Sequence, residues 1–386
     1  MHFVATTGDP ILFWVLRLVV LLSLFLSGYL ISFRDKNGKN YWEYSSIGII
    51  AYSLVEGLRW NRGIDYPHYY QDITGKLFKD YSEVVYLWWT DIFKFSGLPF
   101  WIGFIFYSFL LIWGFYFLIK KFKNQAVWAL PLFFIITIGS SENLIRQFLA
   151  VAMFEFSLFY LWEKKLWKCA IFAILTLQIH SSVIIITMGA LFIQYVHFDK
   201  KIKSGYLMVA VYLFFYYFWN PSFLAPIASW LSAISVDDSS RVSLYLNDAD
   251  FWFSDASSLS DRLGFVSRAA SFFSKTMSLV TTCLIIKYGF DLTKQDGEYR
   301  IAYWFSYLSY ILYVLSNNGD FEIWSRLSIM FNLLIPLVVA GIVTNPSLRT
   351  VEKYIVYSFF GVYFLYNSFF SMWGQSILGS AFVWDK

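Results

Sequence analysis

Apolar runs long enough to cross a lipid bilayer recur from one end of this chain to the other. The first is Ile11–Phe33 and the last is Val351–Phe370. A transmembrane helix needs about 17 to 25 mostly apolar residues, and in hydrocarbon only helices and closed barrels satisfy every backbone polar group. Of the 386 residues, 58% are hydrophobic and only 15% are charged, which excludes a water-soluble globule. We therefore predict an all-α, polytopic integral membrane protein.

The distribution of Lys and Arg among the short loops predicts the topology, because cytoplasmic loops are enriched in both residues. The basic loops are residues 34–43, 120–123, 163–168, 200–203, 287–300 and 349–353. Placing them inside leaves both termini outside, with external loops at about 61–98 and 220–270 and a short external turn at Gly139–Asn143. We expect about twelve transmembrane segments in a single transmembrane domain over residues 1–386.

One apolar stretch, Cys169–Val196, is unusually long and has basic flanks at both ends. Its roughly 28 residues would form a helix of about 42 Å, well beyond a hydrocarbon core of about 30 Å. A single crossing also cannot keep both ends in the cytoplasm. We therefore predict a hairpin of two short segments, broken at the polar cluster Gln178–Ser182. His180 would lie at its apex, on the same outer side as Arg146.

Arginines predicted on the outer side, against the positive-inside bias, are the first candidates for a binding site. They are Arg59, Arg62, Arg146, Arg241, Arg262, Arg268 and Arg326. Because a guanidinium group matches phosphate oxygens in a bidentate way, they suggest an anionic ligand. That interpretation is favoured for Arg146, since a charge inside hydrocarbon has no solvated surface to face. Pairing with nearby aspartates is favoured for the three arginines between 241 and 268, and both interpretations stay open for Arg59 and Arg326, which could extend towards the lipid headgroups.

His180 is the strongest candidate for proton transfer. A histidine in an apolar stretch is commonly a structural hydrogen-bonding residue, but this one lies at the predicted break beside Gln178, Ser181 and Ser182. An imidazole titrates near neutral pH, so it could take a proton from a hydroxyl nucleophile. Asp65, in the sequence RGIDY, is the competing base.

The sequence has no strong motif for a metal ion or a nucleotide. It lacks a Gly-rich phosphate loop and an HExxH pair, and residues 248–250 form a lone DxD. Cys169 and Cys283 both lie in apolar segments and suggest neither a disulfide framework nor a metal site. We expect no cofactor and no metal, so arginines would neutralise a pyrophosphate leaving group.

Two sequence blocks in the N-terminal half resemble those of the EpsG-like family of Wzy-type polysaccharide polymerases. The first is residues 59–70, RWNRGIDYPHYY, and the second is residues 144–182, with IRQFLAVAM, SLFYL and IHSS in that order. The C-terminal half is similar only in hydropathy and in Arg326 before a late helix. Ile64 departs from the family pattern, which often has a small polar residue before the aspartate.

The resemblance implies a GT-C-like, metal-independent glycosyltransferase that crosses the bacterial inner (cytoplasmic) membrane many times. Such proteins are thought to join oligosaccharide repeat units, carried on undecaprenyl pyrophosphate, into O-antigen, capsule or exopolysaccharide at the outer face. The implied catalytic residues are His180 and Asp65, the implied pyrophosphate ligands are Arg146, Arg59, Arg62 and Arg326, and the implied further substrate contacts are Gln147, Tyr66 and Tyr69. The implied partners are the undecaprenyl-pyrophosphate-linked oligosaccharide, membrane lipid and a chain-length regulator, with no nucleic acid.

Other classes of function would use the same residues. A lipid-linked oligosaccharide flippase or other transporter would bind the anionic headgroup through Arg146 and His180 without making a bond. Transporters often have related halves with paired broken helices, whereas this sequence predicts one break and no repeat, which disfavours that class. A ligase that transfers a finished glycan to another acceptor would share nearly all the chemistry, and an outward-facing membrane acyltransferase is a further alternative.

Overall fold

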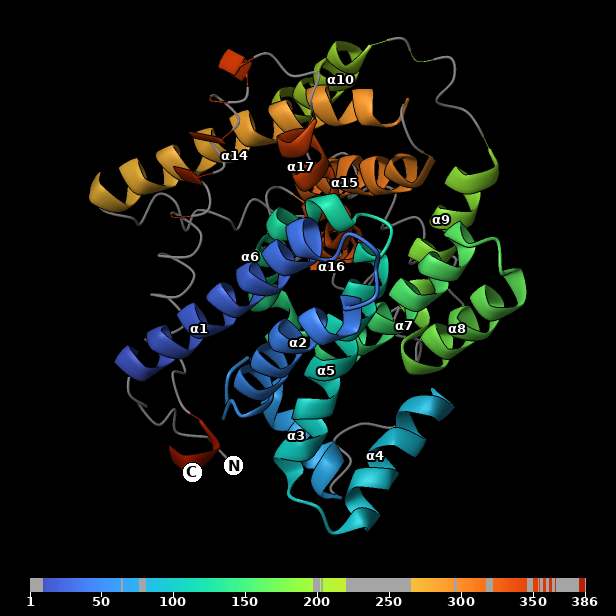
Figure 1. Cartoon of the computed structure of the whole chain (residues 1–386). Helices are drawn as coiled ribbons and strands as arrows, with labels where there is room; N and C mark the ends of the chain where they lie inside the picture. The colour runs from blue at the N-terminus through green and yellow to red at the C-terminus, as the bar shows by residue number, and fades with distance from the viewer. Residues whose placement is uncertain are drawn as a thin grey trace, which may run out of the picture.

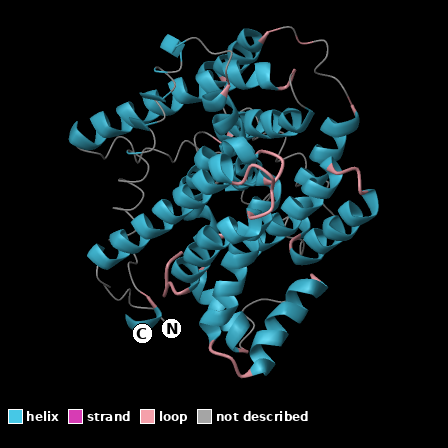
Figure 2. Cartoon of the chain, in the orientation of Figure 1, coloured by secondary structure: helices cyan, strands magenta, loops and turns pink. Residues whose placement is uncertain are grey.

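The computed structural model shows a helical protein (Figure 1). It describes residues 10–63, 65–75, 81–196, 202, 204–219, 265–294, 297–316, 322–345, 350–352, 354, 357–358, 361–362, 365 and 382–385. Within these residues, strand-like pairing is limited to one β-bridge between Arg59 and Phe382 (Figure 2). The external loop predicted at 220–270 lies outside the described residues as far as position 264, and so do Arg241 and Arg262.

The N-terminal half is built from long apolar helices. They are α1 (Pro10–Tyr29, continued by a π-helical turn at Leu30–Arg34), α2 (Tyr41–Gly57), α5 (Phe100–Ile119), α6 (Ala126–Asn143) and α7 (Ile145–Trp162). α1 packs against α2 and α6, α2 packs against α5, and α5 packs against α7 (Figure 1). Small residues permit this close packing: a Cβ on Gly28 of α1 would lie 2.5 Å from the carbonyl oxygen of Ala126.

The predicted turn at Gly139–Asn143 is wrong, because α6 continues through it to Asn143 and is capped by Leu144 (φ −96°, ψ 51°). The polar residues of this stretch suggested that it is exposed to water. Glu142 is instead buried and pairs with arginines from other segments, so its charge does not require the helix to stop.

α7 is deeply buried along most of its length. Every residue from Ile145 to Leu158 is buried, and the helix packs between α5 and α8 (Leu166–Ile179). Two charged side chains of α7, Arg146 and Glu155, therefore face protein rather than lipid or water. Since burying a charge is costly unless it is paired, these two positions need a physical explanation.

The connection at 61–98, predicted as an external loop, contains two helices, α3 (Tyr66–Thr74) and α4 (Val84–Ser96). A proline lies in the first turn of α3, where its missing N–H is not needed. Each helix ends at a glycine in the left-handed conformation, Gly75 at φ +97° and Gly97 at φ +69°. α3 and α4 pack against each other at one end of the molecule (Figure 1).

The predicted break at Gln178–Ser182 is confirmed. α8 ends at Ile179, the next residue, His180, has extended backbone (φ −155°, ψ 108°), and α9 (Ile184–Tyr195) follows one 3₁₀ turn. α8 packs along α7 and against α4, whereas α9 packs against α15 (Gly297–Leu315) (Figure 1). The two segments thus meet mainly at the break instead of pairing along their lengths as a hairpin.

The C-terminal helices form a second group, in the upper part of Figure 1. They are α10 (Gly205–Phe218), α14 (Phe265–Leu292), α15, α16 (Glu322–Phe331) and α17 (Ile335–Thr344). α17 packs against α6 and so joins the two groups. The apolar runs at about 205–219, 271–288, 301–316 and 327–343 also predict helices, and helices occupy all four runs; the helix predicted at 351–370 lies largely outside the described residues.

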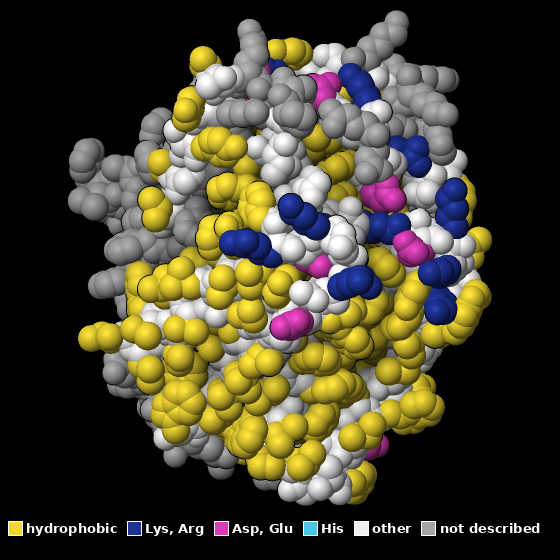
Figure 3. Space-filling view, viewed as in Figure 1, with side chains coloured by type: hydrophobic (Ala, Val, Ile, Leu, Met, Phe, Trp, Pro, Cys, Tyr) yellow, Lys and Arg dark blue, Asp and Glu magenta, His cyan; other side chains and the backbone are white. Residues whose placement is uncertain are grey.

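Five helical segments of the described part are long and apolar enough to cross a membrane, and the chain is a helical membrane protein. They are residues 11–34, 100–119, 123–143, 145–162 and 324–344. On α1, large apolar side chains such as Ile11 and Leu22 are exposed. Figure 3 shows hydrophobic side chains covering the lower part of this face, over α1 and α2, a surface suited to lipid. The count of about twelve segments stays a prediction.

Candidate functional site

The fold places the first motif block against the residues that directly precede the second block. The backbone N–H of Asp65 donates a hydrogen bond to Oδ1 of Asn143 at 3.0 Å, across a sequence separation of 78 residues. Gly63 has φ +97°, and a Cβ there would lie 2.6 Å from the carbonyl oxygen of Glu142. The hydroxyl of Tyr66 donates to the carbonyl oxygen of Arg59 at 3.0 Å. The chain after α2 is therefore folded tightly against the junction between α6 and α7.

Arg146, in the first turn of α7, is buried and paired. Its side chain is 7% exposed, and its Nη1 lies 3.2 Å from Oε2 of Glu83, which is 11% exposed. The guanidinium carbon lies 4.3 Å from the ring centre of Tyr81 and 5.4 Å from that of Tyr86. Aromatic rings at these distances stabilise a cation. The environment therefore holds a positive charge at the start of α7.

Glu83 connects Arg146 to the break after α8. Its Oε1 accepts a hydrogen bond from Oγ of Ser181 at 3.4 Å, and the neighbouring His180 has its Nδ1 2.8 Å from Oγ of Ser182. Burial favours a raised pKa for Glu83, but the charge of Arg146 and nearby backbone N–H groups outweigh it, so its pKa lies below the usual value. Arg146 and the His180 break thus converge on one ionised carboxylate.

Two more of the predicted residues, Asp65 and Arg326, act on Tyr69 of α3. Burial and the charge of Asp65 raise the pKa of Tyr69 to about 12, while Arg146 and Arg326 act in the opposite direction. Gln147 donates from Nε2 to the carbonyl oxygen of Arg326 at 3.4 Å. We call Tyr69, Glu83, Arg146, His180 and Ser181 the Arg146 cluster, with Asp65, Gln147 and Arg326 beside it. These contacts connect both motif blocks to the late helix α16.

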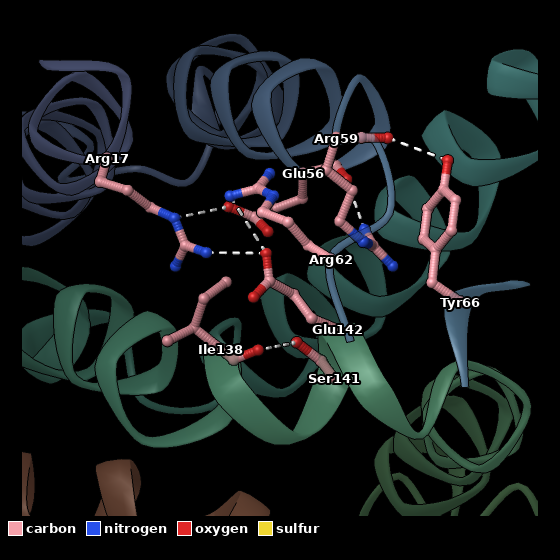
Figure 4. A network of polar contacts seen from close by, with 8 residues as sticks. All are labelled: Arg17, Glu56, Arg59, Arg62, Tyr66, Ile138, Ser141 and Glu142. Carbon is pink, nitrogen blue, oxygen red and sulfur yellow. Dashed lines mark hydrogen bonds and ion pairs between the residues drawn. The ribbon is translucent and has the colours of Figure 1, made fainter. Parts of the chain in front are cut away.

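A second buried group of charges, the Arg17 network, consists of Arg17, Glu56, Arg62 and Glu142 (Figure 4). Nη2 of Arg17 lies 2.7 Å from Oε1 of Glu142, and Nε of Arg17 lies 3.5 Å from Oε1 of Glu56. Nη1 of Arg62 lies 3.3 Å from the same Glu142 oxygen. All four side chains are at most 4% exposed. The network therefore joins α1, α2 and α6 through charges that share partners.

Arg59 lies next to the Arg17 network. Its guanidinium donates to the backbone carbonyl of Glu56 and lies 5.6 Å from the ring centre of Phe104. With Glu56, Tyr107 and Ser141 it lines a cavity of about 20 Å³, enough for about one water molecule. Arg59 and Arg62 are thus placed at the Arg17 network, and Arg146 and Arg326 lie around Tyr69. A role in pyrophosphate binding stays a prediction for all four.

The Arg146 cluster presents a buried guanidinium, paired with a carboxylate, beside hydroxyl groups and an imidazole. Its side chains come from α3, the residue that precedes α4, α7 and the break between α8 and α9. Among the residues that the structure describes, no group of three His, Cys, Asp or Glu side chains could hold a metal ion. Sequence reasoning identified Arg146 and His180 but missed Glu83, which stands in a polar stretch with other acidic residues and carries no local signal.

A family model described as the EpsG family matches residues 42–382. The matched range contains both motif blocks and the whole Arg146 cluster, while Arg17 precedes it. No curated protein and no solved structure matches the chain.

Proposed function

Because the chain belongs to the EpsG family, we propose that it polymerises undecaprenyl-pyrophosphate-linked oligosaccharide repeat units into a surface polysaccharide. The match confirms the resemblance drawn from the two motif blocks, and family membership suggests a membrane protein of the polysaccharide polymerase type. The proposed location is the outer face of the bacterial inner membrane. A chain-length regulator is a proposed partner.

One observation carries the proposal: Arg146 and the His180 break meet at Glu83. A polymerase of this kind must hold a pyrophosphate group next to a group that accepts a proton. Arg146 supplies the positive charge, and its burial strengthens its interaction with an anion. His180 supplies an imidazole on the neighbouring segment. The arrangement supports the proposal, because a cationic group and a candidate base lie within one cluster of side chains.

The proposed reaction transfers the growing chain to a new repeat unit. The terminal hydroxyl oxygen of the new unit attacks the anomeric carbon of the growing chain, and the bond from that carbon to the pyrophosphate oxygen breaks. The hydroxyl proton passes to the imidazole of His180, or to Asp65 as the competing base. Undecaprenyl pyrophosphate leaves with its charge stabilised by Arg146, joined by Arg326.

The remaining predicted residues have positioning roles in this proposal. Gln147 donates a hydrogen bond to the backbone of Arg326. The charges of Asp65 and Arg146 act on the hydroxyl of Tyr69 in opposite directions. Tyr66 stacks on Phe104 with ring centres 4.6 Å apart. Arg59 and Arg62 would contribute positive charge towards a bound pyrophosphate from their positions at the Arg17 network.

We also propose a GT-C-like arrangement with about twelve membrane segments, counting α8 and α9 as two. Five long apolar helices support it, together with the shorter apolar helices at 166–179, 181–195 and 205–218. Non-helical backbone at membrane depth is tolerated when it lines a site within protein. The break at His180 would then be such a place.

The test is a polymerisation assay with the purified protein in nanodiscs and one defined undecaprenyl-pyrophosphate-linked repeat unit. Products are separated on a gel and identified by mass spectrometry. A ladder of lengths spaced by one repeat unit is the expected result. A folded protein that binds an authentic native unit but forms no ladder would overturn the proposal and favour a flippase or a ligase.

A further inference from the structure

The carboxylate of Glu83 occupies a position on Arg146 that a phosphate oxygen could take. Carboxylate and phosphate oxygens make the same charge-assisted contact with a guanidinium group. Here Oε2 of Glu83 lies 3.2 Å from Nη1 of Arg146, and both side chains are largely buried. An Arg146 without this anion would be a buried, uncompensated charge, which is strongly destabilising.

We propose that Glu83 holds the anion position on Arg146 while the site is empty and that a pyrophosphate group displaces it. The inference rests on the proposed function, because it takes Arg146 as the residue that binds pyrophosphate. It adds a residue that no sequence motif indicates. Glu83 is then a positioning residue that keeps Arg146 in place and competes with the ligand.

The local structure allows the carboxylate of Glu83 to leave Arg146. Glu83 directly precedes α4, has extended backbone (φ −80°, ψ 104°), and its side chain makes no capping hydrogen bond to the first turn of that helix. Its contact with Oγ of Ser181 is long at 3.4 Å, and the backbone N–H groups of Glu83 and Ser181 also act on the carboxylate. A displaced carboxylate would remain near Ser181, which it already contacts, and near the positive end of α4, which Glu83 directly precedes.

Displacement would also change the surroundings of His180. Glu83 bonds to Ser181 and acts electrostatically on His180 in the empty site. When pyrophosphate neutralises Arg146, the released carboxylate stays next to the residues of the break. It is then placed to stabilise the imidazolium that forms when His180 accepts a proton. Ligand binding and proton acceptance are thereby linked through one side chain.

The test measures binding of inorganic pyrophosphate to the full-length protein in nanodiscs by calorimetric titration. Removing the competing charge with Glu83→Gln should tighten binding at least about threefold. Glu163→Gln is the matched control, because Glu163 pairs with Lys121 and Lys165 instead and should leave the affinity unchanged. Unchanged or weaker binding by folded Glu83→Gln protein would overturn the inference.

A double-mutant cycle tests whether Glu83 competes with pyrophosphate through Arg146. In an Arg146→Gln background, Glu83→Gln should no longer tighten binding, and an equal gain in both backgrounds would contradict the inference. Should Glu83→Gln not fold, Glu83→Asp withdraws the carboxylate by one methylene, and the same two readouts apply. Tighter pyrophosphate binding without a polymer ladder would retain the inference and overturn the proposed function. A polymer ladder without tighter pyrophosphate binding would retain the proposed function and overturn the inference.

Discussion

The backbone N–H of Asp65 and the side-chain oxygen of Asn143 are joined by a hydrogen bond of 3.0 Å. This contact holds the first motif block against the end of α6. On one side of the junction Glu142 enters the Arg17 network, and on the other side Arg146 begins α7 in contact with Glu83. One short stretch of chain therefore positions both buried groups of charges, and changes within it should affect both.

Gly63→Ala should lower the melting temperature of the protein. Gly63 adopts φ +97°, which an L side chain rarely adopts, and a Cβ there would lie 2.6 Å from the carbonyl oxygen of Glu142. Strain and clash together should cost about 1–3 kcal/mol. The check is thermal unfolding in detergent followed by size-exclusion chromatography.

Gly97→Ala is the control for that experiment. Gly97 also has positive φ (+69°), but nothing lies within 4 Å of a Cβ built there. It therefore reports the backbone strain without the steric clash. Equal melting temperatures for the two variants would mean that close packing at Gly63 does not hold the junction together.

Glu142→Ala should be among the most destabilising single changes in this half of the protein. It would leave Arg17 and Arg62 buried without the carboxylate that both contact. Breaking a buried pair in this way costs about 3–5 kcal/mol. Glu163→Ala, which removes a more exposed carboxylate, should cost less than about 1 kcal/mol. Similar melting temperatures for both variants would contradict a structural role for the Arg17 network.

Glu155→Met should stabilise the protein and leave polymerisation unchanged. Among the described residues, neither carboxylate oxygen of Glu155 has a hydrogen-bond partner, and a Cβ on Gly114 would lie 2.5 Å from Oε2. An unbranched apolar side chain of similar length removes the unsatisfied group. About 2.5 helical turns separate Glu155 from Arg146, so the two point to opposite faces of α7. A lower melting temperature, or loss of the product ladder, would show that the carboxyl group is needed.

Glu83→Gln should reduce the sensitivity of the fold to acid. The pKa of Glu83 lies below its usual value, so its ion pair contributes stability above about pH 4.3, the unfolded value, and that contribution is lost as pH falls through the folded pKa. The wild-type melting temperature should therefore drop more steeply than that of Glu83→Gln between about pH 5 and pH 3. Parallel pH profiles would show that Glu83 is not ionised and paired as described.

Local features of this protein were predictable from the sequence. A polar cluster inside an overlong apolar stretch indicated the break at His180, and a lone charge at the start of a helix indicated Arg146. Arg17 also had a detectable signal, as the single arginine inside the apolar run Ile11–Phe33. Each of these signals depends on one residue type against an apolar background, which periodicity and hydropathy can detect.

The partners of these charges were not predictable in the same way. Arg17 meets Glu142 across 125 residues, and Arg146 meets Glu83 across 63. Which carboxylate reaches which arginine depends on how separate helices pack, and no local pattern encodes it. For the same reason Gly139–Asn143 has the composition of a turn but is helical, since the charge of Glu142 is satisfied by other segments.

The central claim is that Arg146 and His180 serve one polymerising site. The most direct measurement is the rate of chain elongation in nanodiscs, with one defined lipid-linked repeat unit, for wild type, Arg146→Ala, His180→Ala and Gln178→Ala. Gln178 is exposed and lies in the last turn of α8, two residues before His180, so its variant controls for disturbance of that segment. We predict that Arg146→Ala abolishes the ladder, that His180→Ala slows elongation by about 10²-fold or more, and that Gln178→Ala elongates normally. Normal elongation by folded Arg146→Ala and His180→Ala proteins would contradict the account.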